Sequence, residues 1–388
     1  MAVRLGSEIL LASGRLHGRR VGILCNPASV DSALAHIVDT LAKEPGVRIA
    51  AVFGPQHGFR ADVQDNMIET SHGRDWRHDV PVYSLYSETR EPTADMLKDA
   101  DALVIDLQDV GARIYTFIYT MANCLRAARA HGVPVIVCDR PNPIGGTLVQ
   151  GPMLTPGYES FVGQFPIPMR HGMTVGELAR FFNDACGIGA RLDVVAMEGW
   201  QRSMYYDDTG LPWVMPSPNM PTLDTAVVYP GTVLFEGTNL SEGRGTTRPF
   251  EIVGAPWVNP EALCRKLEAH ELPGVRFRPV VFEPTFQKHA RTACGGCQIH
   301  VLDRTVFEAV ASGVAVLAEI RSQNPSRFEW RQPPYEYEHV RLPIDILAGS
   351  EELRAQVEAG LSVRTICDSW KKEIERFRSL REPFLLYG

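Results

Sequence analysis

The segment from Met215 to Glu251 contains more reactive and hydrogen-bonding side chains than a connecting loop requires. Loops often carry function because a rigid scaffold can position their side chains while their backbone stays free of ladder hydrogen bonds. Carboxylates in such a loop could perform acid–base chemistry, amides could bind hydroxyl groups, and arginines could bind a carboxylate. The residue types therefore favour a site for a polyhydroxylated, anionic ligand, and they are Asp224, Glu236, Glu242, Glu251, Arg244, Arg248, Asn219 and Asn239.

Two of these carboxylates, Glu236 and Glu242, stand close together in the sequence. A glycoside hydrolase typically needs two carboxyl groups, about 5–5.5 Å apart for retention or roughly 6.5–9.5 Å apart for inversion of the anomeric configuration. Such a pair could form within the segment, or between the segment and Asp106 or Asp109. The chain has 46 acidic residues, so the spacing by itself is a weak signal.

The two arginines of the segment have two readings. Arg244 and Arg248 could clamp a substrate carboxylate through forked hydrogen bonds. They could equally tie Glu236 or Glu251 into structural salt bridges, because a buried carboxylate needs a partner.

Five short apolar runs near the start of the chain are predicted strands. Their near-continuous hydrophobicity indicates strands covered on both faces, hence a parallel sheet flanked by helices and a Rossmann-like N-terminal domain. No G-x-G-x-x-G follows the first run, so a dinucleotide cofactor is not implied. The predicted strands are Arg20–Cys25, Arg48–Phe53, Val82–Tyr86, Ala102–Leu107 and Val133–Cys138, and helices are predicted at Ser32–Lys43 and Ile114–His131.

Polar residues stand at or just beyond the end of each predicted strand. Ligands of open parallel sheets bind at the carboxyl edge, so these residues favour a site. His57 could shuttle protons near neutral pH or could hydrogen-bond the backbone of its turn, and the same alternatives hold for His171. With these two histidines, the candidates of the N-terminal domain are Asn26, Gln56, Arg60, Glu88, Asp106, Gln108, Asp109, Arg113, Tyr115, Asp139, Arg140 and Asn142.

The rest of the chain divides into a loop-rich part of the first domain and a smaller second domain. Residues 151–250 contain one clear helix, Thr174–Cys186, which Thr174 and Glu177 open as a capping box. Residues 251–388 show a separate α/β pattern, so we predict domains at 1–250 and 251–388. The second domain should contain helices at Pro260–His270 and Arg304–Asn324, strands at Val275–Phe282 and Gly296–Leu302, and a further short strand at His339–Asp345, and Leu353–Leu380 should be mostly helical.

Composition excludes several classes of function. The net charge of −7 argues against nucleic acid as the main partner. No run approaches the ~18 apolar residues of a membrane span, and the apolar stretch Ile9–Ala12 is too short for a secretory signal, so we expect a cytoplasmic protein without a membrane partner. Cys294 and Cys297 form a single CxxC without the second pair that a zinc site needs.

Metal and serine-hydrolase chemistry lack their usual spacings. A metal site from His57, Asp65, Asp106 and Asp139 is conceivable, but no HxH, HxxxE or HExxH pattern supports one. There is also no GxSxG nucleophile elbow. We therefore expect neither a metal nor an organic cofactor.

Several long motifs occur in an order that resembles one family. They are FGPQHGF, DLQDVGARIYTF, DRPNPIGG, FPIPMRHGMTVGELA, PSPNMPT, YPGTVLFEGTNLSEGRGTTRPFE and CGGCQIHV. From about Val21 to its C-terminus the chain resembles the NamZ-type exo-β-N-acetylmuramidases, also called YbbC-like. The resemblance implies a Rossmann-like domain, a smaller C-terminal domain and a cleft between them. It also implies hydrolysis of terminal, non-reducing N-acetylmuramic acid from peptidoglycan fragments, a small carbohydrate substrate, without metal or nucleotide; a homodimer is an open alternative to a monomer.

The resemblance also implies roles for particular residues. The lactyl carboxylate of N-acetylmuramic acid would suit Arg60, Arg140, Arg244 or Arg248, and its hydroxyl groups would suit Asn142, Asn219 and Asn239.

One position departs from the family pattern. Where the family usually reads Glu-His-Gly, with that Glu as the acid–base candidate, this chain has Gln56, and an amide cannot be a general acid. Three outcomes follow: another carboxylate takes the role, the chemistry serves a related sugar, or the protein binds without cleaving. The replacement candidates are Glu88, Asp106, Asp109 and Glu236, and Glu236 is the first to mutate.

Overall fold

The computed structural model describes residues 3–65 and 67–388. Its N-terminal part is built on a seven-stranded sheet in the order β3-β4-β2-β1-β5-β6-β9, and every pair is parallel except β3 with β4. Without β3, this is the 3-2-1-4-5-6 order of a Rossmann fold. The strands are β1 (Arg20–Cys25), β2 (Arg48–Gly54), β3 (Gly73–Asp75), β4 (Val80–Ser84), β5 (Ala102–Asp106), β6 (Val135–Cys138) and β9 (Leu192–Val195).

Both faces of the sheet are buried at its central strands β1, β5 and β6, as their apolar runs indicated. In β5, Leu103 and Ile105 pack into one hydrophobic core, whereas Val104 between them packs into another. A strand covered on both faces has no polar alternation, and this explains its continuous hydrophobicity. The helices around the sheet are α1 (Gly6–Ala12), α2 (Ile37–Lys43), α3 (Ala94–Leu97), α4 (Phe117–His131) and α5 (Val175–Arg180).

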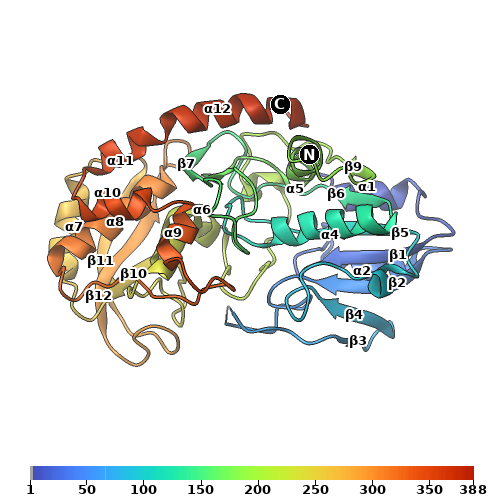
Figure 1. Cartoon of the computed structure of the whole chain (residues 1–388), viewed down its shortest axis with the longest axis horizontal. Helices are drawn as coiled ribbons and strands as arrows, with labels where there is room; N and C mark the ends of the chain where they lie inside the picture. Colours follow the sequence, from blue (N-terminus) through green and yellow to red (C-terminus); the bar gives the residue numbers. More distant parts are fainter. Residues whose placement is uncertain (1–2, 66) are drawn as a thin grey trace.

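The C-terminal part contains a three-stranded antiparallel sheet, β10-β12-β11 (Figure 1). The predicted α/β class, with a Rossmann-like N-terminal domain and a smaller C-terminal α/β domain, is therefore confirmed. Its strands are β10 (Ile252–Ala255), β11 (Val275–Phe282) and β12 (Cys294–Val301), and its helices are α7 (Pro260–Glu268), α8 (Ala309–Gln323), α9 (Pro343–Ala348), α10 (Glu352–Glu358), α11 (Val363–Ser369) and α12 (Lys371–Arg381).

The CxxC sequence lies in β12, and packing accounts for it. Cys294 and Cys297 are free and buried. A Cβ atom at Gly296 would lie 1.9 Å from the carbonyl oxygen of Val253, so the glycine lets β10 and β12 approach closely.

Two sequence predictions of local structure were wrong. The Met215–Glu251 segment is not all loop, because it contains helix α6 (Leu223–Thr232) and a 3₁₀ helix (Val233–Gly237). The glycines of the segment suggested loops, but Gly231 packs on α8, where a Cβ would lie 1.9 Å from the carbonyl oxygen of Ala309. The predicted strand His339–Asp345 is instead irregular backbone that leads into α9, which begins at Pro343, a position in the first turn that proline favours.

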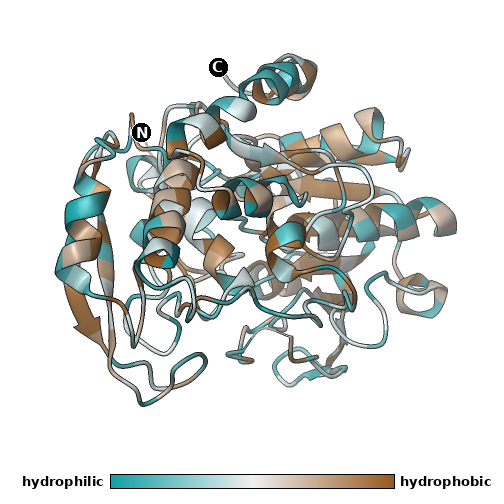
Figure 2. Cartoon of the chain, turned by 60° about the vertical axis from the view of Figure 1, so that its left-hand side comes forward, coloured by the Kyte–Doolittle hydropathy of each residue, from teal (hydrophilic) through white to brown (hydrophobic). Residues whose placement is uncertain are grey.

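The last helix runs back across the molecule. Figure 1 shows α12 along the top, leading from the C-terminal part to an end near α1 and α5. Figure 2 shows α12 as largely hydrophilic on its outside, while the strands inside are mostly hydrophobic. Among residues 3–65 and 67–388, no helix combines the length and apolar character that crossing a membrane requires.

Candidate active site

A pocket at the junction of the two parts gathers side chains that are far apart in the sequence; we call it the junction pocket. Its walls come from the turn after β2, the segment before α4, the segment around α6, and the loop between α8 and α9. Of the predicted site residues, Gln56, His57, Tyr115, Asn219, Glu236 and Arg244 line it. The other lining residues are Ile114, Thr116, Phe117, Val162, Ser217, Met220, Tyr229, Phe250, Tyr335 and Glu336.

Glu236 is the carboxylate that the Met215–Glu251 segment contributes. It lies in the 3₁₀ helix after α6 and is 4% exposed. Arg244 Nη2 donates to its Oε1 over 2.7 Å, and the Tyr335 hydroxyl donates to its Oε2 over 2.6 Å. Burial alone would raise the pKa of Glu236, but the charge and hydrogen bond of Arg244 outweigh burial and hold that pKa below its ordinary value. Glu236 is therefore an ionised carboxylate at neutral pH.

Glu336 is a second pocket carboxyl, which the sequence did not single out. It is 4% exposed. Gln56 Nε2 donates to its Oε1 over 3.0 Å, and the Tyr86 hydroxyl donates to its Oε2 over 2.8 Å. Burial raises the pKa of Glu336 to about 7, and the charge of Glu236 acts in the same direction. The only hint in the sequence was a glutamate between two tyrosines after a double proline, in the aromatic loop at 327–338.

His57 is held as a neutral imidazole. Its Nδ1 lies 2.8 Å from the carbonyl oxygen of Val63, and a carbonyl can only accept, so Nδ1 carries the hydrogen. Burial, with the charge of Arg244 acting in the same direction, lowers the pKa of His57 to about 4. Of the two roles considered for His57, a proton shuttle and a backbone hydrogen bond, His57 makes the backbone hydrogen bond. Its side chain also lines the pocket.

The polar ends of β1, β5 and β6 mostly hydrogen-bond one another. Asn26 donates to the backbone oxygen of Gln108, and Arg140 holds Asp106 through two hydrogen bonds of 2.6 and 2.9 Å. All of these side chains are at most 1% exposed. The switch point between β1 and β5, where ligands of Rossmann folds bind, is therefore filled by the protein's own side chains.

The remaining predicted residues lie outside the lining of the junction pocket. Arg113 is fully buried and donates to backbone oxygens that include that of Leu347, so it links the two parts of the chain. Glu88 is exposed. Three of them form ion pairs: Arg60 with Asp75, Arg248 with Glu251, and Glu242 with Arg244 and Lys288. Asp109 lies 3.6 Å from His171. The side-chain amides of Asn142 and Asn239 donate to the backbone oxygens of Met173 and Arg327.

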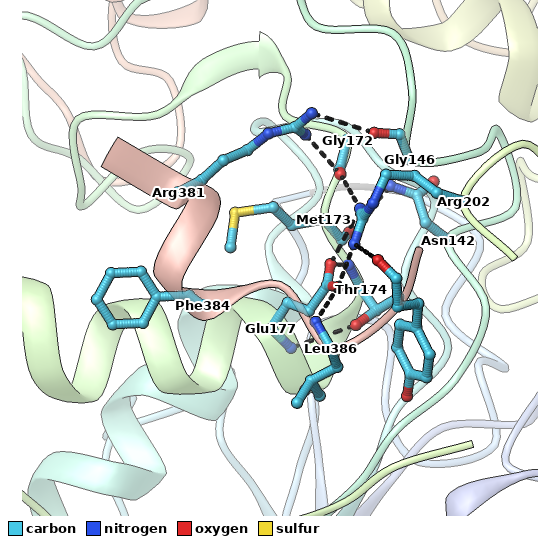
Figure 3. Close-up of polar contacts among 12 residues, drawn as sticks. Asn142, Gly146, Gly172, Met173, Thr174, Glu177, Arg202, Arg381, Phe384 and Leu386 are labelled. Carbon is cyan, nitrogen blue, oxygen red and sulfur yellow. Dashed lines mark hydrogen bonds and ion pairs between the residues drawn. The ribbon is translucent and has the colours of Figure 1, made fainter. Parts of the chain in front are cut away.

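The C-terminal tail docks beside the end of β6. Figure 3 shows Glu177, the N3 residue of the α5 capping box, in contact with Arg202 and with the backbone nitrogen of Leu386. Next to it, the Tyr387 hydroxyl donates to Asp139 over 2.6 Å. Thr174 donates to the same oxygen of Asp139 over 2.8 Å. Asp139 therefore holds the tail in place.

The Asp139 contact predicts a dependence of stability on pH. Burial raises the pKa of Asp139 to about 7, so between about pH 4 and pH 7 the folded protein keeps a proton that the unfolded chain has lost. Wild-type stability therefore falls through this window as pH rises. Asp139→Asn removes the titration while keeping the shape, so its unfolding free energy relative to wild type should increase from pH 5 to pH 8, measured by urea denaturation. The control Asp101→Asn, whose parent carboxyl has a lowered pKa, should show no such trend.

The described residues were compared with the donor sets of metal sites. No group of three or more His, Cys, Asp or Glu side chains among them could hold a metal ion. The chemistry open to the junction pocket is that of its carboxyls, Arg244, and the hydroxyl and amide groups around them.

Known proteins are similar to this chain in sequence and in fold. Residues 21–224 match the family model "Exo-beta-N-acetylmuramidase NamZ, N-terminal", and residues 227–387 match its C-terminal counterpart. The chain is 47% identical over 387 residues to the peptidoglycan beta-N-acetylmuramidase NamZ of Bacillus subtilis (strain 168), covering 99% of this chain and 91% of that protein.

Crystal structures of two DUF1343 family proteins from Bacteroides fragilis NCTC 9343 have the same fold. One has a TM-score of 0.90 at 36% identity and the other 0.79 at 28%, and each comparison covers 100% of this chain and 99% of the other. The resemblance seen in the motifs is confirmed, and the chain belongs to the NamZ family of exo-β-N-acetylmuramidases.

Proposed function

We propose that this chain hydrolyses the glycosidic bond of a terminal, non-reducing N-acetylmuramic acid in peptidoglycan fragments, by carboxylate acid–base chemistry. One observation carries the proposal: the junction pocket holds two buried carboxyls, Glu236 and Glu336, whose pKa values are shifted in opposite directions. Glycoside hydrolysis needs such a pair, one carboxyl protonated and the other ionised. The name of the Bacillus subtilis relative supports the choice of sugar.

Groups around the two carboxyls suit this sugar. Arg244 lines the pocket and can face the lactyl carboxylate. Ser217 and Asn219 offer a hydroxyl and an amide for the sugar's own hydroxyl groups. Arg244 also pairs with Glu236 and Glu242, but it borders the pocket, whereas Arg60, Arg140 and Arg248, which were also predicted for the lactyl group, pair with Asp75, Asp106 and Glu251 outside the pocket lining.

The experiment is an assay of sugar release. The protein is incubated with MurNAc–GlcNAc at pH 5, 7 and 9, with the GlcNAc–GlcNAc disaccharide as a matched substrate that lacks the lactyl group. We expect release of N-acetylmuramic acid from the first substrate and little cleavage of the second. The absence of release at all three pH values would refute the proposal.

A second candidate function is binding without cleavage, and Gln56 is the observation that favours it. An amide occupies the position where the family usually has the glutamate that is its acid–base candidate. Titration calorimetry with MurNAc–GlcNAc would decide: heat of binding without any product supports a sugar-binding homologue, whereas product formation excludes it.

A further inference from the structure

The carboxyl of Glu336 is presented by an unusual turn in the loop between α8 and α9. Tyr335 and Glu338 exchange two backbone hydrogen bonds of 2.9 Å, and the residues between them, Glu336 and Tyr337, have φ angles of 46° and 68°. A tight turn with two positive φ angles normally uses asparagine and glycine. Side chains larger than glycine are strained there, and such strain persists mainly at functional sites.

The turn reaches from the C-terminal part into the N-terminal part, where two side chains hold Glu336 differently. Gln56 is fixed, because the Thr116 hydroxyl donates to its Oε1 over 2.9 Å while its Nε2 donates to Glu336. Tyr86 is adaptable, because a hydroxyl can donate to a carboxylate or accept from a carboxylic acid. The proton of a neutral Glu336 therefore belongs on Oε2, the oxygen that faces Tyr86.

The charged and titratable groups around Glu336 oppose one another, so both its carboxylic acid form and its carboxylate form are accessible. Tyr86 and Gln56 stabilise the carboxylate, while burial and the negative charge of Glu236 stabilise the acid. Arg244 favours the carboxylate, but it is already engaged by Glu236. A general acid is most effective when its pKa is close to the working pH.

We propose that Glu336 is the general acid of the reaction and that Gln56 is the positioning residue that orients it. This assignment rests on the proposed function. Glu336 gives its proton to the glycosidic oxygen as the bond from that oxygen to the anomeric carbon breaks, and the bonding electrons leave with the oxygen. The aglycone departs as an alcohol. A water adds its hydroxyl to the anomeric carbon, and its second proton returns to Glu336.

The same geometry explains how glutamine is compatible with activity at position 56. A glutamate there would bring a second carboxyl to hydrogen-bonding distance of Glu336, and two such groups share one proton. Glutamine instead supplies a neutral hydrogen-bond donor that does not titrate, so Glu336 is the only group of this pair that gains and loses a proton.

The test compares Glu336→Gln on two substrates. On MurNAc–GlcNAc, whose leaving group is a poor one, we expect kcat to fall by about 10²–10⁴-fold, the usual contribution of a general acid. On an aryl N-acetylmuramide, whose phenol leaves without a proton, the loss should be at least tenfold smaller. Glu338→Gln, the matched control in the same turn outside the pocket lining, should keep wild-type rates on both substrates.

Gln56→Ala gives an independent readout of positioning. It removes a hydrogen bond that favours the carboxylate, so the alkaline limb of the pH–kcat profile should move to higher pH. This shift keeps the assignment testable if Glu336→Gln fails to fold. Equal losses on the two substrates, or an unchanged limb in Gln56→Ala, would overturn the assignment; failure of the wild-type protein to release sugar would instead overturn the proposed function.

Discussion

Replacing Glu236 by glutamine is expected to lower kcat/KM for release of N-acetylmuramic acid by about 10²–10³-fold, as when one electrostatic contact to a transition state is removed. The anomeric centre becomes positively charged as the glycosidic bond breaks. Arg244 and Tyr335 keep Glu236 ionised and fixed in the junction pocket, so its charge is in place before the reaction begins. The variant is measured by steady-state kinetics, with circular dichroism to confirm folding.

Glu251→Gln is the matched control for Glu236. Glu251 is also 4% exposed and also pairs with an arginine, Arg248, but it does not line the pocket. It accepts a hydrogen bond of 2.7 Å from Thr225, so the control should lose some stability and little activity. If Glu236→Gln and Glu251→Gln reduce kcat/KM equally, Glu236 acts through the fold and has no electrostatic role in the reaction.

Replacing Asp106 by asparagine should destabilise the fold by about 3–5 kcal/mol, because it leaves the Arg140 guanidinium as an unpaired buried charge. Asp106 is 0% and Arg140 1% exposed. Within residues 3–65 and 67–388, the Arg140 guanidinium forms an ion pair with no other carboxylate, and its Nη1 makes no hydrogen bond. The loss is measured as the change in unfolding free energy from urea denaturation.

An ion pair at the opposite end of β1 provides the comparison. Arg20 and Asp101 are joined over 2.9 Å, but both are nearly half exposed. Solvent screens such a pair, so Asp101→Asn should leave the midpoint of denaturation almost unchanged. A large loss in Asp101→Asn, or a small one in Asp106→Asn, would contradict the view that burial sets the importance of these pairs.

The parallel sheet could be predicted because its signal is local. A strand such as β5 is apolar without interruption because both of its faces are covered. The start of helix α5 is also a local signal, because Thr174 and Glu177 form their capping hydrogen bonds across only three residues. Helix α6 was missed because its local signals favour a loop, whereas the packing that stabilises the helix is not local. Pro230 and Gly231 are local loop signals, and the close packing of Gly231 on α8 outweighs them.

The candidate site was only partly predictable. Polar residues at strand ends were expected to face a ligand, and Gln56, His57 and Tyr115 do line the junction pocket. Other polar residues have the same position relative to their strands but bind the protein itself. Asp106 and Arg140 pair with each other, and Asp139 binds the C-terminal tail. A polar residue at a strand end can bind a ligand or satisfy a buried neighbour, and its type and spacing are the same in both cases.

The sequence by itself determined the family and the Rossmann-like sheet, and it singled out Glu236 as the first carboxylate to test. Only the tertiary structure decided which carboxyl stands opposite it, because Gln56 and Glu336 are 280 residues apart and meet through the folding of both domains. Sequence periodicity and turn chemistry extend over a few residues. The pKa of a carboxyl depends instead on burial and on the charges within a few ångströms, so the proton states of Glu236 and Glu336 exist only once the pocket has formed.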